Sequence, residues 1–232
     1  MNIALSLAEF LKSQGADLVS FAELTLIPAG VRLNMHTGVS IAVALNPDIV
    51  RQIENGPTQE YYEEYKRLNE LLSALSVQGA RFLKDRGFQA ISSAATNEGI
   101  DPETESTVLP HKTVATLAGL GWIGKCALLI TEAYGSAVRI NKILTDAPLP
   151  AGQPSSESRC GVCNICVDAC PGHAPSGKEW SRAGRRDDFF NAFACRQAAQ
   201  KLAIERTGIA ETFCGICIAV CPWTRNYVKK ST

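Results

Sequence analysis

The sequence predicts an α+β fold in two parts, an α/β ligand-binding domain over residues 1–148 and a cysteine-rich module over residues 149–232. Three observations lead to this division. Helical and strand patterns alternate in the first part, and residues 146–159 change to Pro, Ser, Gly and Ala without apolar periodicity. Eight of the nine cysteines follow that change. With 232 residues, the chain is long enough to bury a substantial core.

The elements of the first part are predicted from the spacing of apolar residues. Helices are expected over residues 3–14, 57–86 and 112–119, with Gly15 and Gly87 ending the first two. Short β-branched or apolar runs predict strands over residues 18–26, 39–46, 88–92, 127–131 and 136–144, the last two as a hairpin. A polar loop is expected over residues 95–106. In the second part we expect a helix over residues 187–206 and a solvated tail over residues 223–232.

Charge and composition exclude several classes of protein. The 23 basic residues balance the 23 acidic ones, which argues against a dedicated DNA or RNA binder and against an anionic membrane as partner. The N-terminus lacks the basic start of a signal peptide, and no run approaches the roughly 20 apolar residues that span a bilayer. The sequence therefore predicts a cytoplasmic protein whose cysteines are reduced and bind metal.

The cysteines form two runs that end in Cys-Pro. The first, residues 160–171, has the spacing C-x2-C-x2-C-x3-C-P of bacterial two-cluster ferredoxins, in which the fourth cysteine binds the other cluster. The second, residues 214–222, is one ligand short, and Cys195 can supply it. We therefore predict two [4Fe–4S] clusters. The first is held by Cys160, Cys163, Cys166 and Cys221, and the second by Cys170, Cys195, Cys214 and Cys217.

Two alternatives to clusters are a zinc ribbon and a disulfide framework, because C-x2-C pairs occur in both. Zinc takes four ligands in two pairs, whereas the first run holds four cysteines at fixed spacing. The ninth cysteine, Cys126, is left over and is interpreted as a small buried side chain. His36, His111 and His173 are possible cobalt or proton-transfer ligands, but no metal spacing surrounds any of them.

Residues 119–125 match the start of a phosphate-binding loop, G-x-x-x-x-G-K, but fail its further requirements. The next residue is Cys126 instead of Ser or Thr, and the segment follows a helical stretch and precedes a strand. Nucleotide hydrolysis is therefore not predicted. The three glycines either allow close approach to a flat or bulky group beside Lys125, or form a tight turn that packs against Trp122.

The strings Gly-Leu-Gly-Trp-Ile-Gly-Lys at residues 119–125 and Cys-Pro-Trp at residues 221–223, with the cysteine runs between them, resemble epoxyqueuosine reductase. That family is related to the reductive dehalogenases, and the resemblance covers residues 105–225. It implies a nitroreductase-like α/β domain that binds cobalamin, followed by a ferredoxin-like module that feeds it electrons from a low-potential donor. By this resemblance the corrin would contact Gly119, Gly121, Trp122, Gly124, Lys125 and Ser136.

The sequence also departs from the family. An acidic residue of the family, thought to donate a proton, has only Glu105 as a possible counterpart here. The chain ends ten residues after Pro222, where the tRNA-modifying enzyme continues into a helical domain, so we expect a short form that does not act on tRNA.

Three hypotheses about function remain. The first is a reductase that delivers electrons to a corrinoid, either as a cofactor for a small substrate or as the substrate itself, within a corrinoid protein. The second is a ferredoxin-type carrier with a partner-binding domain. The third is an epoxyqueuosine reductase that acts on tRNA.

Overall fold

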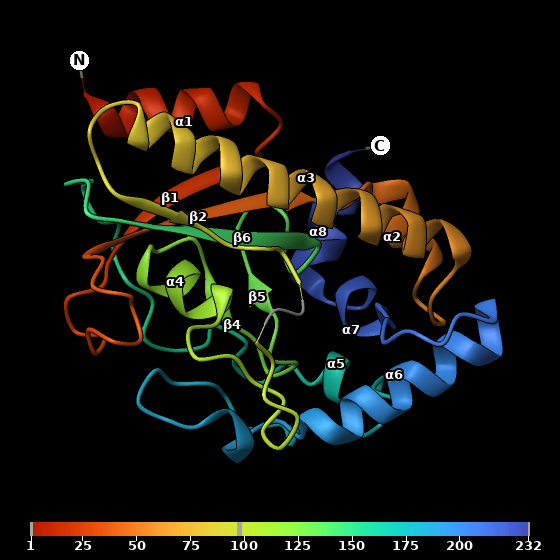
Figure 1. Cartoon of the computed structure of the whole chain (residues 1–232). Coiled ribbons are helices and arrows are strands. Elements are labelled where there is room, and N and C mark those ends of the chain that lie inside the picture. Colours follow the sequence, from red (N-terminus) through yellow and green to blue (C-terminus); the bar gives the residue numbers. More distant parts are fainter. Residues whose placement is uncertain (1, 97–98, 232) are drawn as a thin grey trace. The chain divides into compact units, whose positions relative to one another are not determined.

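The computed structural model describes residues 2–96 and 99–231 (Figure 1). The chain forms two compact units, each built from three segments. Unit 1 contains residues 1–43, 67–120 and 139–155, and unit 2 contains residues 44–66, 121–138 and 156–232. The sequence-based boundary between residues 148 and 149 stays a prediction about domains.

Unit 1 is built on a four-stranded sheet in the order β1-β2-β6-β3. The strands are β1 (Leu18–Glu23), β2 (Thr37–Ala44), β6 (Val138–Thr145) and β3 (Ala90–Ser92). β1 pairs antiparallel with β2, and β3 pairs antiparallel with β6. Residues 39 and 41–43 of β2 are buried, which agrees with the β-branched run that predicted a central strand.

Helices cover the sheet on both faces (Figure 1). On one face lie α1 (Ile3–Ser13) and the part of α3 (Gln59–Lys84) that belongs to unit 1. There, a Cβ at Gly79 of α3 would come within 2.5 Å of Ile143 on β6 and 3.1 Å of Leu11 on α1. On the other face, α4 (His111–Leu117) places Val114 against Gly38 of β2. The mixed α/β character predicted from the sequence is therefore present.

Several predictions about elements need correction. The strand at residues 136–144 does not form a hairpin with residues 127–131, because β6 lies between β2 and β3 in the sheet. The helix α2 (Pro47–Gln52) was not predicted, although Pro47 at its first turn and the Asn46 side chain, which accepts from Asp48 N, start it. The polar loop at 95–106 includes residues 97 and 98, which lie outside the described residues.

Residues 146–155 of the proline- and serine-rich stretch belong to unit 1. Gly152 N donates to Phe21 O at 2.8 Å, and Ser155 N donates to Thr116 O at 2.9 Å. A Cβ at Gly152 would lie 2.2 Å from Ala118 O. A segment without apolar periodicity is thus held by its backbone hydrogen bonds.

Unit 2 carries the cysteine runs on short elements. A two-stranded antiparallel sheet, β4 (Trp122–Ile123) and β5 (Leu129–Ile130), precedes them. The runs include α5 (Ile165–Asp168) and α7 (Ile216–Ala219), which pack together, and η1 (Arg186–Asp188) and α6 (Ala192–Thr207) lie between the runs in sequence. The helix predicted over residues 187–206 is thus α6 with a later start.

The expected solvated tail is the helix α8 (Pro222–Lys230). Thr224 is fully buried, and Tyr227 Oη donates to Leu45 O at 2.9 Å. Pro222 at the first helical position starts the helix with no hydrogen bond lost, because the first amides of a helix have no partner within it. The prediction was wrong because the basic, polar composition concealed these contacts.

The stability of unit 1 is expected to fall between pH 6.5 and 4. Burial lowers the pKa of His111 to about 4, and Lys142, whose Nζ lies 3.4 Å from His111 Nδ1, acts in the same direction. In this range the unfolded chain binds a proton that the folded chain does not, so lowering the pH favours unfolding. Between pH 7.5 and 5.5, wild type should lose about 1 kcal/mol more than His111→Asn, measured from urea midpoints. Equal losses in the two proteins would contradict this account.

Among the described residues, no helix combines the length and the apolar character needed to cross a membrane.

Candidate iron–sulfur centres

The fold brings the last cysteine of the second run to the first run. Cys221 is 6% exposed and is packed with Cys160. Burial raises the pKa of the Cys221 thiol. Hydrogen bonds from the amides of Thr224 and Trp223 lower this pKa, and the nearby thiols of Cys160 and Cys166 raise it further. The cysteine spacing predicts Cys221 as a ligand of the first cluster, and its proximity to Cys160 agrees with that prediction.

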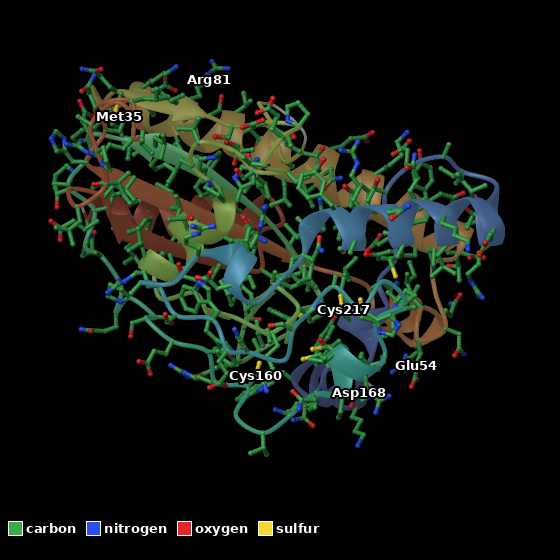
Figure 2. The ribbon with its side chains drawn as sticks, turned by 90° about the horizontal axis from the view of Figure 1, so that it is seen from below. Met35, Glu54, Arg81, Cys160, Asp168 and Cys217 are labelled. Carbon is green, nitrogen blue, oxygen red and sulfur yellow. The ribbon has the colours of Figure 1, made fainter. Side chains whose placement is uncertain are left out.

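A second group of cysteines gathers around the end of the first run. Cys214 lies close enough to Cys170 for the two thiols to interact electrostatically, and Ala174 N donates to Cys170 Sγ at 3.5 Å. The turn after Cys170 lies on α6, because a Cβ at Gly172 would lie 2.7 Å from Ala194 O. Cys195 follows Ala194 on that helix. This placement agrees with Cys195 as a predicted ligand of the second cluster. In Figure 2, Cys160 marks the first cysteine run and Cys217 marks the second.

The alternatives to clusters have different geometric requirements. All nine cysteines are free thiols. A zinc site needs four ligands that converge on one point. Across residues 2–96 and 99–231, no group of three or more His, Cys, Asp or Glu side chains is arranged to hold a single metal ion.

One buried polar atom tests whether the first group of cysteines fits an iron–sulfur cluster. The Trp122 indole is 1% exposed, and its Nε1 has no hydrogen-bond partner among the described residues. The ring packs with Cys160 and Cys221, and its edge meets Trp223 with ring centroids 4.9 Å apart. An N–H without an acceptor in such a place costs about 1–3 kcal/mol. A cluster sulfur beside Cys160 and Cys221 would be a suitable acceptor, so these residues fit the cluster.

Lys125 lies beside the loop of the first run. Its side chain is buried at 4% exposure, and Nζ donates to Gly161 O at 2.8 Å and to Asn164 Oδ1 at 2.9 Å. Gly161 and Asn164 flank Cys163 in the sequence. The sequence analysis did not predict this contact, since it placed Lys125 beside a corrin.

Cys126, the ninth cysteine, lies between ligands predicted for different clusters. Its thiol is 4% exposed and hydrogen-bonds with Cys166 and Cys217. The bond with Cys166 lowers the pKa of Cys126, whereas the bond with Cys217 and burial raise it, and the net shift is upward. The interpretation of Cys126 as a small buried side chain omitted this contact, which its position after the glycine-rich turn did not reveal.

Replacing Cys126 with Ala should leave about eight iron atoms per chain, because the eight predicted ligands remain. Iron and sulfide analysis after anaerobic purification measures this, with Cys126→Ser as the variant that keeps a polar atom. A loss of about four irons in both variants would instead make Cys126 a ligand.

Other residues of the chain lie against the residues that are predicted to contact a corrin. In unit 1, a Cβ at Gly119 would lie 2.3 Å from Gln153 O. In unit 2, a Cβ at Gly121 would lie 2.1 Å from Ile130 O, and one at Gly124 would lie 2.4 Å from Ile130 Cδ1. The buried Ser136 N donates to Thr224 Oγ1 at 3.0 Å. These contacts explain the residue types from within the chain, and corrin binding by the six residues stays a prediction.

Glu105, the weak candidate for a proton donor, lies in a turn of unit 1. Its φ is +50°, and its backbone N donates to Asp101 O at 2.7 Å. The short bridge between Asp101 and Ser106 encloses this turn. These contacts assign Glu105 a place in the loop and leave its catalytic role a prediction.

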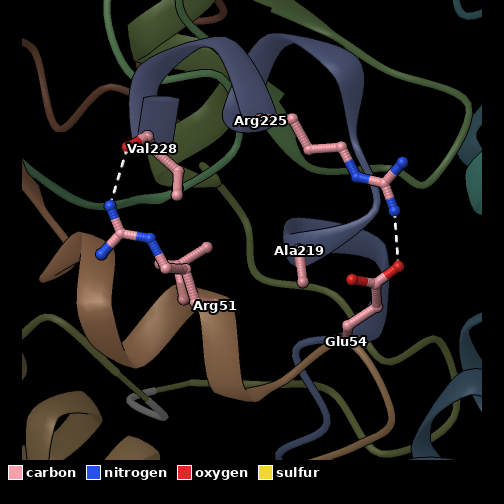
Figure 3. Close-up of a pocket in the computed structure, with 6 residues that line it drawn as sticks. Arg51, Glu54, Ala219, Arg225 and Val228 are labelled. Atoms are coloured by element: carbon pink, nitrogen blue, oxygen red, sulfur yellow. Dashed lines mark hydrogen bonds and ion pairs between the residues drawn. The ribbon is translucent and has the colours of Figure 1, made fainter. Parts of the chain in front are cut away.

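A pocket of about 300 Å³ in unit 2 was not predicted (Figure 3). It is lined by Val50, Arg51, Glu54, Ala219, Arg225 and Val228. Arg51 donates to Val228 O at 3.0 Å, and Arg225 pairs with Glu54 at 2.5 Å. Because these polar groups bind one another, the lining alone identifies no ligand.

Comparisons with known proteins agree with the cysteine pattern. Residues 159–224 match a 4Fe–4S double cluster binding domain. Epoxyqueuosine reductase from Synechococcus sp. (strain RCC307) is 35% identical over 127 residues, which cover 55% of this chain and 38% of that protein. The enzyme from Aliivibrio fischeri is 30% identical over 181 residues, covering 73% of this chain and 44% of that protein.

The chain is a relative of epoxyqueuosine reductases. The resemblance predicted from the sequence is thereby confirmed, and the double-cluster domain supports [4Fe–4S] clusters as cofactors. The chain spans less than half of the length of these two relatives.

Solved structures share the fold at low sequence identity. Epoxyqueuosine reductase from Bacillus subtilis has a TM-score of 0.63 and 21% identity, covering 96% of this chain and 65% of that one. The catabolic reductive dehalogenase NpRdhA has a TM-score of 0.68 and 18% identity, covering 95% of this chain and 33% of that one. They establish a mixed α/β fold similar to that of both enzymes, and the nitroreductase-like assignment remains a prediction.

The expectation that tRNA is not a partner is contradicted by these relatives. They are epoxyqueuosine reductases, and another solved structure with the same fold contains a tRNA-Tyr stem loop modified with epoxyqueuosine, at a TM-score of 0.62 and 20% identity. The expectation depended on balanced charge and on the position of the chain end, and neither property excludes tRNA as a partner.

Proposed function

We propose that the chain is an iron–sulfur oxidoreductase that uses two [4Fe–4S] clusters to carry electrons from a low-potential donor to a corrinoid. The observation that carries the proposal is the proximity of thiols from the two runs, with Cys221 near Cys160 and Cys166 and with Cys214 near Cys170. An exchange of ligands between the runs, as in two-cluster ferredoxins, would account for this proximity, and the match of residues 159–224 to a double-cluster domain supports it. Such clusters supply electrons one at a time.

The residues of unit 2 would prepare these clusters for electron transfer. The amides of Ala174, Trp223 and Thr224 lie at ligand sulfurs, and hydrogen bonds to sulfur and burial are among the properties that set cluster potentials. The corrinoid is the acceptor implied by the resemblance.

A second candidate is reduction of epoxyqueuosine in tRNA. The relatives at 30% and 35% identity bear this name, which favours a modified tRNA base as the final electron acceptor. Both candidates use the same electron supply, so they differ only in what receives the electrons.

The test begins with anaerobic purification, iron and sulfide analysis, and electron paramagnetic resonance. About eight irons are expected, and stoichiometric zinc or about four irons would overturn the two-cluster assignment. The reduced protein is then titrated with cob(II)alamin, where a spectral change of the cobalamin supports the corrinoid. Conversion of an epoxyqueuosine stem loop in the presence of cobalamin would support the second candidate. Eight irons with neither response would favour the simple carrier.

A further inference from the structure

We propose that Lys125 raises the reduction potential of the first cluster, the one assigned to Cys160, Cys163, Cys166 and Cys221, and that the Trp122 indole acts on the same cluster. This inference rests on the proposed function, because it requires the cluster. Residues 119–125, which resemble the start of a phosphate-binding loop, would then control electron flow.

The Lys125 ammonium is buried among neutral acceptors. The residue is 4% exposed, and its Nζ donates to Gly161 O and Asn164 Oδ1, which are both neutral. Neutral acceptors satisfy hydrogen bonds but do not cancel a charge, and a buried charge is costly unless an opposite charge lies nearby. Four thiolates around a [4Fe–4S] core carry a net negative charge, so the first cluster can provide the counter-charge.

Lys125 also binds the loop that carries two predicted ligands of the first cluster. Gly161 directly follows Cys160, and Asn164 directly follows Cys163. The two hydrogen bonds of Lys125 Nζ therefore fix its charge beside the loop of Cys160 and Cys163.

A second donor, Trp122, lies on β4, three residues before Lys125. Trp122 pairs with Ile130 across β4 and β5, and its orphaned Nε1 lies in the group that contains Cys160 and Cys221. The hairpin turn that follows places Lys125 at the loop of Cys160. A positive charge near the cluster and an N–H that donates to a cluster sulfur both stabilise the extra electron of the reduced cluster, and both therefore raise its potential.

Other charges near the loop are exposed or paired. The exposed Glu179 accepts from Gly161 N at 2.7 Å. Arg159 lies 5.0 Å from the Trp122 ring centroid and pairs with Glu132 at 2.6 Å, with both side chains more than half exposed. Solvent screens these charges more strongly than the buried ammonium.

The test is a redox titration of full-length, anaerobically purified protein, followed by electron paramagnetic resonance. In Lys125→Met, the equilibrium constant for one-electron reduction of one cluster should fall about tenfold or more, which corresponds to about 59 mV for each factor of ten. The other cluster should shift less than threefold. Lys125→Arg should keep most of the wild-type potential, and Trp122→Phe should lower the potential of the same cluster as Lys125→Met.

Glu179→Gln serves as the matched control, since it changes an exposed charge at the same loop and should shift the potential little. Eight irons in Lys125→Met with unchanged potentials would overturn the inference and leave the proposed function intact. Loss of about four irons in that variant would also overturn it, because the lysine would then be needed for assembly. Wild-type protein without clusters would instead remove the proposed function.

Discussion

Replacing Cys195 with Ala should reduce the iron content from about eight to about four atoms per chain and remove the signal of one cluster. Cys195 is the only predicted ligand outside the two runs, and it lies on α6 beside the turn that follows Cys170. The first cluster should survive, because its ligands are Cys160, Cys163, Cys166 and Cys221.

The substitution should leave the helix itself intact. Alanine favours helix formation, and α6 keeps its N-cap, where Asn191 accepts from Ala194 N, and its left-handed C-cap at Gly208. Iron analysis and electron paramagnetic resonance of Cys195→Ala, beside Cys126→Ala, measure the effect. Retention of eight irons in Cys195→Ala would remove Cys195 from the ligand set, whereas loss of every iron would show that the two clusters do not assemble independently.

The features that the sequence predicted well depend on short-range patterns. The spacing within each cysteine run is local, and so are the apolar periods that predicted α1 and α3. In α3 the leucines at three- and four-residue steps lie on the covered face, and Leu68, Leu72, Leu75 and Leu83 are fully buried. Such periods report which face of a helix is covered, although they do not report what covers it.

The features that escaped prediction depend on contacts distant in sequence or on elements too short to show a period. β4 has two residues, so no alternation can identify it. The hydrogen bond between Lys125 and Gly161 joins residues that are 36 positions apart in the sequence. The hydrogen bond between Ser136 and Thr224 joins residues that are 88 positions apart. The resemblance to a family assigned these residues to a corrin, whereas the contacts within the chain explain Lys125, Ser136 and the glycines of the motif.

The glycines illustrate why residue type alone was ambiguous. Close approach of a backbone to a ligand and close approach of two strands both require a missing Cβ. Only coordinates distinguish them, and at Gly121 the atom that approaches is Ile130 O. Gly121 is therefore required by the close approach of β4 and β5, and its presence alone is not evidence for a cofactor.

Gly121→Ala should destabilise the protein by about 3 kcal/mol and disturb the first cluster. The new Cβ would lie 2.1 Å from Ile130 O, 2.9 Å from Ile130 C and 3.3 Å from Thr131 Cα. All three are backbone atoms, so no side-chain rotation can relieve the clash, and β4 must move away from β5. Because β4 carries Trp122, the indole moves with it.

The matched control is Gly30→Ala, since a Cβ there meets no atom within 4 Å and should change the free energy of unfolding by less than about 0.5 kcal/mol. Urea unfolding gives the stability of both variants, and electron paramagnetic resonance gives the line shape of each cluster. In Gly121→Ala the first cluster should change and the second should not, because Trp122 packs with Cys160 and Cys221. If Gly121→Ala is destabilised but the signals of both clusters are unchanged, the position of β4 does not affect the first cluster. Trp122 would then also not control the potential of that cluster.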